Sequence, residues 1–411
     1  MKTPATALLL VNQRAYKMPV YPTVVVCVDG CEPDYLAQAV AAGRMPWLKH
    51  TLAQGVALRA DCALPSFTNP NNLSIVTGVP PSVHGISGNY FLEHTGGQAV
   101  MMNDPRWLRC PTLLAEAARA GLSVAVVTAK DKLRTLLGHG LRGICVSAEC
   151  ADAATLETHG IVAVLELVGR PMPSVYSADL SEFVFAAGVR LMETRRPDLM
   201  YLSTTDYVQH KHAPGTPQAN DFYAMLDGYM AQLEALGCVI ALTADHGMHG
   251  KTKMDGTPQV TYLSDWLRDF LQRDDFRVIL PITDPYVVHH GALGSFATVY
   301  LPQDVSADGL CEALQKLQGI ESALPRAQAA RLLELPADRI GDVVVLGDHF
   351  TALGTTAAEH DLSGLDVPLR SHGGRGEQTV PLIVNRPAPR LDRNHHWRNF
   401  DVFDLALNYA Q

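Results

Sequence analysis

The chain has 411 residues, of which 47% are apolar and 18% charged, and its 33 Lys and Arg against 42 Asp and Glu give a formal net charge of −9. This composition excludes a disordered chain, because the apolar content is high enough to form a core. The net acidity argues against a nucleic-acid partner, since neutralising phosphates requires a cationic surface. No run of about 18 apolar residues occurs, which argues against a membrane partner.

Residues 1–20 predict an N-terminal arm. Its apolar run, Ala7–Val11, is shorter than the roughly 7–15 residues of a secretory signal core. The eight cysteines form no CxxC pair, and several lie in apolar, strand-like runs, which favours buried free thiols over disulfides. We therefore expect a cytoplasmic protein.

Short apolar runs alternate with amphipathic segments through the first 245 residues. Alternating strands and helices predict an α/β fold, with a mainly parallel sheet and helices on both faces. The expected strands are 23–28, 56–62, 123–128, 144–147, 199–203 and 238–243, and the expected helices are 112–120, 178–194 and 221–236.

After residue 258 the pattern changes to β-β-α-α-β. We expect paired strands over 284–301 around Gly291–Gly294, helices at 307–317 and 325–333, and a strand at 342–346. Residues 259–365 thus predict a smaller inserted α+β cap domain, and residues 21–258 and 366–411 predict the core. A strand at 380–384 and a helix at 402–410 close the chain.

Five places at strand ends or in loops offer metal-ligating side chains. Parallel strands end at one edge of a sheet, which is where ligands bind in such folds. A spacing of four residues, as in Asp206 and His210, puts both side chains on one helical face. The candidates are Asp29, Thr68, Asp206 with His210, Asp245 with His246, and His372.

Each candidate has a plainer interpretation. Asp29, Asp245 and Thr68 are also typical helix caps, and a single loop histidine such as His372 is usually structural. Their convergence favours a metal, because three carboxylates placed together repel unless a cation holds them. A mixed Asp and His set suits zinc, ahead of iron or manganese. Six such ligands exceed what one four-coordinate ion needs, so we expect two zinc ions per chain.

The ordered motifs resemble the alkaline phosphatase superfamily, in its nucleotide pyrophosphatase/phosphodiesterase branch. The resemblance covers roughly residues 23–255 and 370–400. The motifs are Val28-Asp29-Gly30, Thr68-Asn69-Pro70-Asn71, Thr77–Gly85, Asp206–His210, Thr243–Met248 and His372-Gly373.

The resemblance implies the alkaline phosphatase fold and two metal sites. Asp206, His210 and His372 would hold one zinc. The other would be held by Asp29, Thr68, Asp245 and His246, with Thr68 as the nucleophile. One departure is that Asn69, rather than a proline, follows the nucleophile.

Two further elements, Ser87–Phe91 and Thr128–Leu133, resemble members of that branch that cleave the C–P bond of a small carboxylated phosphonate. Asn89 would donate to a phosphoryl oxygen. Lys130 and Lys132 would bind the carboxylate and stabilise the charge that the leaving carbon develops. The plainer interpretations are a turn residue for Asn89 and solvated surface for the lysines, although cations at a helix N-terminus oppose its dipole.

We therefore expect a hydrolase that acts on a small anionic phosphonate through a phosphothreonine. A phosphodiesterase or nucleotide pyrophosphatase on the same metal core is the alternative, and it would require an apolar nucleoside slot. A non-catalytic metal-binding protein is a remote one. A homodimer is expected only from the general frequency of symmetric pairs. The remaining histidine candidates, among them His212 and His249, are interpreted as structural or surface residues.

Overall fold

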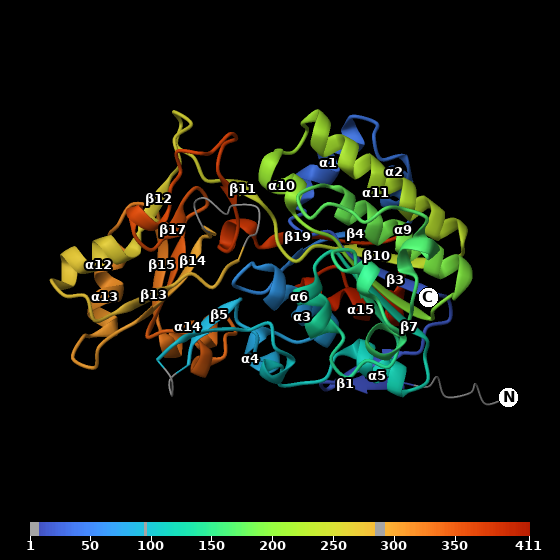
Figure 1. Ribbon diagram of the computed structural model, residues 1–411, viewed down its shortest axis with the longest axis horizontal. Helices are drawn as coiled ribbons and strands as arrows, with labels where there is room; N and C mark the ends of the chain where they lie inside the picture. The colour runs from blue at the N-terminus through green and yellow to red at the C-terminus, as the bar shows by residue number, and fades with distance from the viewer. Residues whose placement is uncertain (1–7, 94–96, 284–291) are drawn as a thin grey trace.

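The computed structural model describes residues 8–93, 97–283 and 292–411. Two sheets lie side by side along the long axis of the molecule, a large one flanked by helices and a smaller one with its own helices (Figure 1). Within the described ranges, we find no helix with the length and apolar character that crossing a membrane requires.

The large sheet has seven strands in the order β4-β19-β10-β3-β9-β7-β8. The five strands from β10 to β8 pair in parallel, and β19 runs antiparallel to both of its neighbours. The predicted α/β class with a mainly parallel sheet is confirmed. The strands are β3 (Thr23–Cys27), β4 (Val56–Asp61), β7 (Val124–Thr128), β8 (Ile144–Ser147), β9 (Leu199–Ser203), β10 (Val239–Thr243) and β19 (Thr379–Val384).

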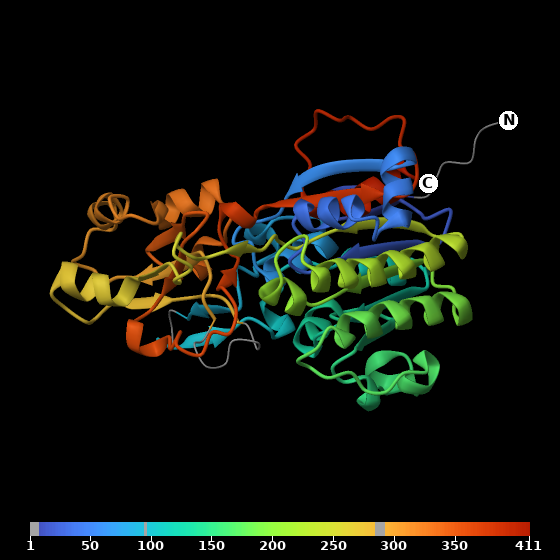
Figure 2. The ribbon, with the colours of Figure 1, turned by 90° about the horizontal axis from the view of Figure 1, so that it is seen from above.

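Helices cover both faces of this sheet, which explains why strands such as β3 and β10 are buried along their whole length. One face carries α1 (Pro33–Ala41), α2 (Pro46–Gln54), α9 (Asp179–Thr194) and α11 (Pro217–Ala235), as Figure 2 shows from above. The other carries α3 (Thr68–Thr77), α5 (Leu113–Arg119) and α15 (Val402–Asp404).

Three of the predicted helices differ from expectation by three residues or more, and one of them, expected at 307–317, ends at Leu314. Helix α11 begins four residues earlier than predicted, because Thr216 caps it by accepting from Ala219 N and Pro217 fills its first position. The closing helix is short, and a π-helical turn, Leu405–Tyr409, follows α15.

The segment predicted as an N-terminal arm is, from Leu8 onward, a hairpin of β1 (Leu8–Val11) and β2 (Arg14–Lys17). Tyr16 is fully buried, and Arg14 forms an ion pair with Asp401 at 2.7 Å. These contacts attach the start of the chain to its end.

The smaller sheet has the order β13-β14-β16-β15 and is antiparallel throughout. The paired strands predicted over 284–301 are partly wrong. Their first half falls on residues 284–291, outside the described ranges, and β14 pairs with β13 and β16 instead. The strands are β13 (Arg277–Ile279), β14 (Phe296–Tyr300), β15 (Ile320–Pro325) and β16 (Val343–Gly347), and the helices are α12 (Leu263–Leu271), α13 (Ala307–Leu314) and α14 (Arg326–Leu332).

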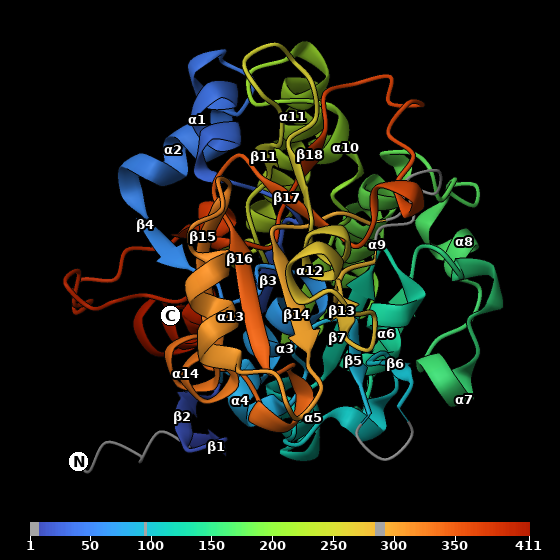
Figure 3. The same ribbon diagram turned by 90° about the vertical axis from the view of Figure 1, so that its left-hand side faces the viewer.

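Helices α12 and α13 cover the outer face of this smaller sheet (Figure 3). Its other face packs on the loop before α3, where Phe296 and Leu346 share an apolar cluster with Leu64 and Phe67. The chain passes to the smaller sheet through β11 (His249–Gly250) and returns through β18 (Arg370–Ser371), which pair antiparallel to each other. The inserted segment therefore contacts the part of the core that carries Thr68 and His372.

Candidate active site

Thr68 is the first residue of α3, and a rigid loop delivers it there. Asn71 accepts from Ala63 N at 2.7 Å, and its Nδ2 donates to the carbonyls of Ala63, Pro65 and Phe67. Pro70 lies in the first turn, where no backbone donor is needed. Phe67 occupies the N-cap position, so the plainer alternative for Thr68, a helix cap, is wrong, and its hydroxyl lies 3.3 Å from His246 Nε2 instead.

The acidic candidates follow three adjacent parallel strands. Asp29 comes shortly after β3, Asp206 after β9, and Asp245 after β10. Because the three strands pair in one direction, their carboxylates meet at one edge of the sheet. The plainer alternative for Asp29 and Asp245, that they cap helices, is wrong, since Glu32 occupies the N-cap of α1 and the short strand β11 is the next element after Asp245.

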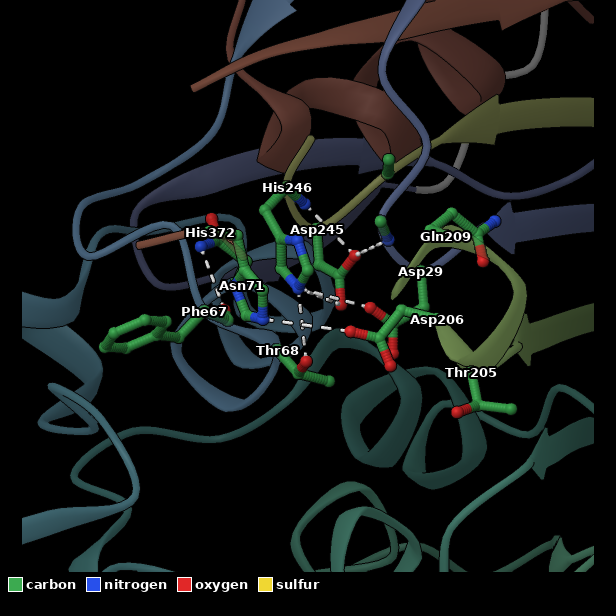
Figure 4. Close-up of polar contacts among 12 residues, drawn as sticks. Asp29, Phe67, Thr68, Asn71, Thr205, Asp206, Gln209, Asp245, His246 and His372 are labelled. Atoms are coloured by element: carbon green, nitrogen blue, oxygen red, sulfur yellow. Dashed lines mark hydrogen bonds and ion pairs between the residues drawn. The ribbon is translucent and has the colours of Figure 1, made fainter. Parts of the chain in front are cut away.

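The side chains of Thr68 and of the Asp and His candidates labelled in Figure 4 point toward one another. His246 Nε2 lies 3.3 Å from Thr68 Oγ1, 3.2 Å from Asp29 Oδ1 and 3.9 Å from Asp245 Oδ2. Asp206 Oδ2 lies 3.0 Å from His210 Nε2 and 3.7 Å from His372 Nε2. The rings of His246 and His372 stack, with centroids 3.6 Å apart. All six Asp and His side chains are buried.

Each histidine is oriented by a backbone carbonyl. Nδ1 lies 2.8 Å from Gly247 O in His246, 2.8 Å from Ser66 O in His372 and 3.1 Å from Arg370 O in His210. A carbonyl only accepts, so Nδ1 is the donor in every ring. Nε2 is thereby turned to the carboxylates, as second partners orient metal-ligating histidines.

The carboxylates perturb one another strongly. Burial, followed by the charges of Asp206 and Asp245, raises the pKa of Asp29 well above its usual value. Burial also opposes the charged form of Asp206, but His210 and His372 outweigh it and hold that pKa below its usual range. Burial lowers and the three carboxylates raise the pKa of His246, to about 10. Such a cluster requires compensating positive charge.

The donors form two groups whose ligating atoms lie within 4.8 Å of one another: Asp206, His210 and His372, and Asp29, Asp206 and His246. Asp206 belongs to both. Asp245 adjoins the second group, held by Asn72 Nδ2 at 3.1 Å and by the backbone N–H groups of Gly30 and His246. These buried carboxylate and imidazole donors are candidate metal-binding clusters.

A cavity of about 280 Å³ opens beside these groups. Lys130 occupies the N-cap position of α6 (Asp131–Leu137), and Lys132 lies in its first turn. The intervening Asp131 is bound by Arg134 Nε at 2.5 Å and Ser147 Oγ at 2.8 Å. Of the sequence-predicted residues, the cavity is lined by Asp29, Thr68, Asn89, Lys130, Lys132, Asp206 and His372.

Several residues that line the cavity belong to none of the sequence candidates, and two of these, Thr283 and Glu149, hold other residues of the cavity in place. Thr283, from the inserted segment, accepts from Asn89 Nδ2. Glu149 accepts from Asp131 N at 2.8 Å and so fixes the start of α6 between the two lysines. Neither belongs to a motif, and no spacing pattern in the sequence singles them out. The eight cysteines all lie in described segments and are free.

Comparison with known proteins identifies the family of this chain. Residues 23–375 match the family of type I phosphodiesterases and nucleotide pyrophosphatases. The chain belongs to this family of enzymes, whose fold is that of alkaline phosphatase.

Within the family, the chain is a homologue of phosphonoacetate hydrolases. It is 54% identical to phosphonoacetate hydrolase from Sinorhizobium meliloti 1021 in complex with phosphonoacetate, with a TM-score of 0.96 over 99% of this chain and 100% of that one. The phosphonoformate complex matches equally, at 55% identity and a TM-score of 0.96 over the same shares. Murine ectonucleotide pyrophosphatase/phosphodiesterase 5 shares the fold, at 16% identity and a TM-score of 0.62 over 95% of this chain and 96% of that one.

A curated relative carries the same name. A stretch of 38 residues, 8% of this chain, is 60% identical to phosphonoacetate hydrolase from Penicillium oxalicum. The match spans about half, 53%, of that relative's length.

Proposed function

We propose that this chain hydrolyses phosphonoacetate to acetate and phosphate at a dinuclear zinc site, through a phosphothreonine on Thr68. The observation that carries the proposal is that one cavity is lined by Thr68, by two lysines and by three of the metal-ligand candidates, Asp29, Asp206 and His372. The identity to the Sinorhizobium meliloti enzyme, which binds phosphonoacetate, supports it.

Asp206, His210 and His372 would hold one zinc, and Asp29, Thr68, Asp245 and His246 the other. Bound zinc would supply acidification of a coordinated oxygen, as it lowers the pKa of water from about 15.7 to about 7, and would neutralise phosphoryl charge.

The chain's own residues would position the substrate and handle its charge. Thr68 Oγ1 would attack phosphorus with the phosphonate oxygens near the N-terminus of α3, where backbone N–H groups favour an anion. Asn89 Nδ2 would donate to one of these oxygens. As the C–P bond breaks, its electron pair passes to the methylene carbon and delocalises into the carboxylate, whose growing charge Lys130 and Lys132 would stabilise.

The carbanion takes one proton from solvent to complete acetate, and this balances the proton that the Thr68 hydroxyl releases to solvent as its oxygen bonds to phosphorus. A water molecule attacks the phosphothreonine from the side opposite Thr68, releases phosphate and restores the hydroxyl. The overall reaction consumes one water and leaves the chain unchanged.

The alternative, a phosphodiesterase or nucleotide pyrophosphatase, has less support from the cavity. Its volume of about 280 Å³ is at the small end of the range for ligand pockets. None of the described residues that line it carries a Phe, Tyr or Trp side chain on which a base would stack. Two lysines instead suit a compact dianionic acid.

The test is phosphate release from phosphonoacetate by zinc-loaded protein, beside hydrolysis of a nitrophenyl phosphodiester. We expect the phosphonate to be the better substrate, with activity lost on chelation and restored by zinc. Thr68→Ala should abolish turnover by at least about 1000-fold, because the covalent route is lost, whereas Thr68→Ser, which keeps a hydroxyl, should retain part of it. If phosphonoacetate released no phosphate, the substrate assignment would be wrong, and if Thr68→Ala matched the wild type, the nucleophile would be wrong.

A further inference from the structure

A second group of charged side chains lies outside the cavity, where the chain passes between the core and the inserted segment. Glu377 and Lys251 are both fully buried, and their side chains pair at 2.7 Å. His249 lies 3.2 Å from Glu377 through Nδ1 and 2.5 Å from Glu32 through Nε2. None of these four residues lines the cavity, so the reaction proposed above does not use them directly.

Glu377 contacts two of the segments that carry metal-ligand candidates. Its Oε2 accepts from Gly374 N at 3.1 Å, two residues after His372. Its backbone carbonyl accepts from Gly247 N at 2.7 Å, next to His246. One residue thus ties together the His372 loop and the turn after Asp245 and His246.

Lys251 and His249 extend these ties. His249 belongs to β11, which pairs with β18 immediately before His372, and its ring reaches Glu32, three residues after Asp29. Lys251 Nζ donates to His349 O at 2.8 Å, in the inserted segment. The Glu377 carboxylate is therefore linked to the segment after Asp29 through His249, and to the inserted segment through Lys251.

The four side chains form a balanced set. Two carboxylates, Glu32 and Glu377, face the ammonium of Lys251 and the imidazole of His249. His249, His349 and Glu377 also have the types and spacing of metal ligands, but Lys251 Nζ at 2.7 Å from Glu377 already supplies the cation there. A buried ion pair of this kind depends on both partners, because removing one leaves an uncompensated charge.

We propose that Glu377 is a positioning residue for the metal site, and that its carboxylate, braced by Lys251 and His249, sets the spacing between the histidines of the two zinc sites. The inference rests on the proposed dinuclear site. It assigns to this side chain the task of holding Gly374, two residues after His372, in register with His249, three residues after His246.

The test compares zinc affinity in Glu377→Gln, which keeps the shape of the side chain and removes its charge. We expect zinc dissociation constants, measured by competition with a chromogenic chelator, to rise about 10- to 100-fold, as for other partners of metal ligands. The absorption spectrum of the cobalt-substituted protein should shift as the ligand geometry changes. Asp342→Asn is the matched control, because it removes the ion pair with Arg326 in the smaller sheet (2.8 Å) and should leave both readouts unchanged.

The outcomes separate the two proposals. If the wild type bound no zinc, the proposed function would fail, whatever Glu377 does. If the wild type bound two zinc ions and Glu377→Gln bound them equally tightly with the same cobalt spectrum, the positioning role would be overturned. Should Glu377→Gln fail to fold, His249→Gln, at the partly exposed end of the group, takes its place with the same two readouts and a smaller expected loss.

Discussion

The imidazole of His249 makes the free energy of unfolding of this protein fall as the pH rises into the alkaline range. Burial opposes a charge on this ring, but hydrogen bonds to Glu32 and Glu377, together with their charges, outweigh burial and raise its pKa to about 9. The ring of His349 also faces it, and Lys251 binds the same carboxylate of Glu377. We predict that His249→Gln removes a stabilising contribution that the wild type has at neutral pH and loses in alkali.

The size and sign follow from the pKa values. An unfolded histidine titrates near 6.5, so a folded pKa of about 9 corresponds to about 3 kcal/mol, at about 1.4 kcal/mol per pKa unit. Because the folded pKa is the higher one, this stability is fully present below pH 6.5 and is lost as the pH rises through about 9. The wild type should therefore exceed His249→Gln by an amount that declines steadily across that interval.

Urea unfolding of the chelator-treated proteins from pH 6 to pH 10 measures this difference. The free energy of unfolding of the variant is subtracted from that of the wild type at each pH. This difference cancels the titration of the metal-ligand candidates, which both proteins share. A difference that stayed constant from pH 6 to pH 10 would refute the charged state assigned to His249.

Two further predictions concern the site itself. Lys130→Gln and Lys132→Gln should each lower kcat/KM for phosphonoacetate by about 10- to 100-fold, because each removes a charge-assisted hydrogen bond of about 1.5–3 kcal/mol. Both variants should lower kcat/KM for an activated phosphate ester far less. Equal losses on the two substrates would count against carboxylate recognition. Gly373→Ala should lower zinc content and Tm, because Gly373 has φ +122° and an added Cβ would meet Phe67 Cε1 at 2.4 Å. The control is Gly169→Ala, at a position with φ +69° and nothing within 4 Å of an added Cβ, and it should leave zinc content intact. Equal zinc contents in the two variants would contradict this reasoning.

Much of the fold was accessible from the sequence because buried parallel strands are nearly continuous apolar runs. Every strand predicted for the core lies within one residue of its observed bounds. The meeting of Asp29, Asp206 and Asp245 was accessible for the same reason, since residues that end parallel strands share an edge. By contrast, the partner of β14 was missed, because antiparallel pairing in the smaller sheet depends on which strands lie side by side rather than on local pattern.

The finer organisation of the site was not accessible. Asp206 belongs to both ligand groups. This depends on the direction of its side chain, which the spacing of residues along the sequence does not encode. His249 was interpreted as structural or surface, and its two carboxylate partners, Glu32 and Glu377, lie 217 and 128 residues away from it in the chain. The domain boundaries, the homodimer, the cytoplasmic location and the identity of the metal stay predictions.

The place of β19 in the sheet has a consequence for biosynthesis. This strand lies between β4 and β10, yet it is translated after both of them, and His372 emerges only just before it. A nascent chain therefore holds two strands with unsatisfied backbone edges, which are prone to association with other chains. The sheet cannot close, and the full set of metal-ligand candidates cannot come together, before His372 and β19 have been translated.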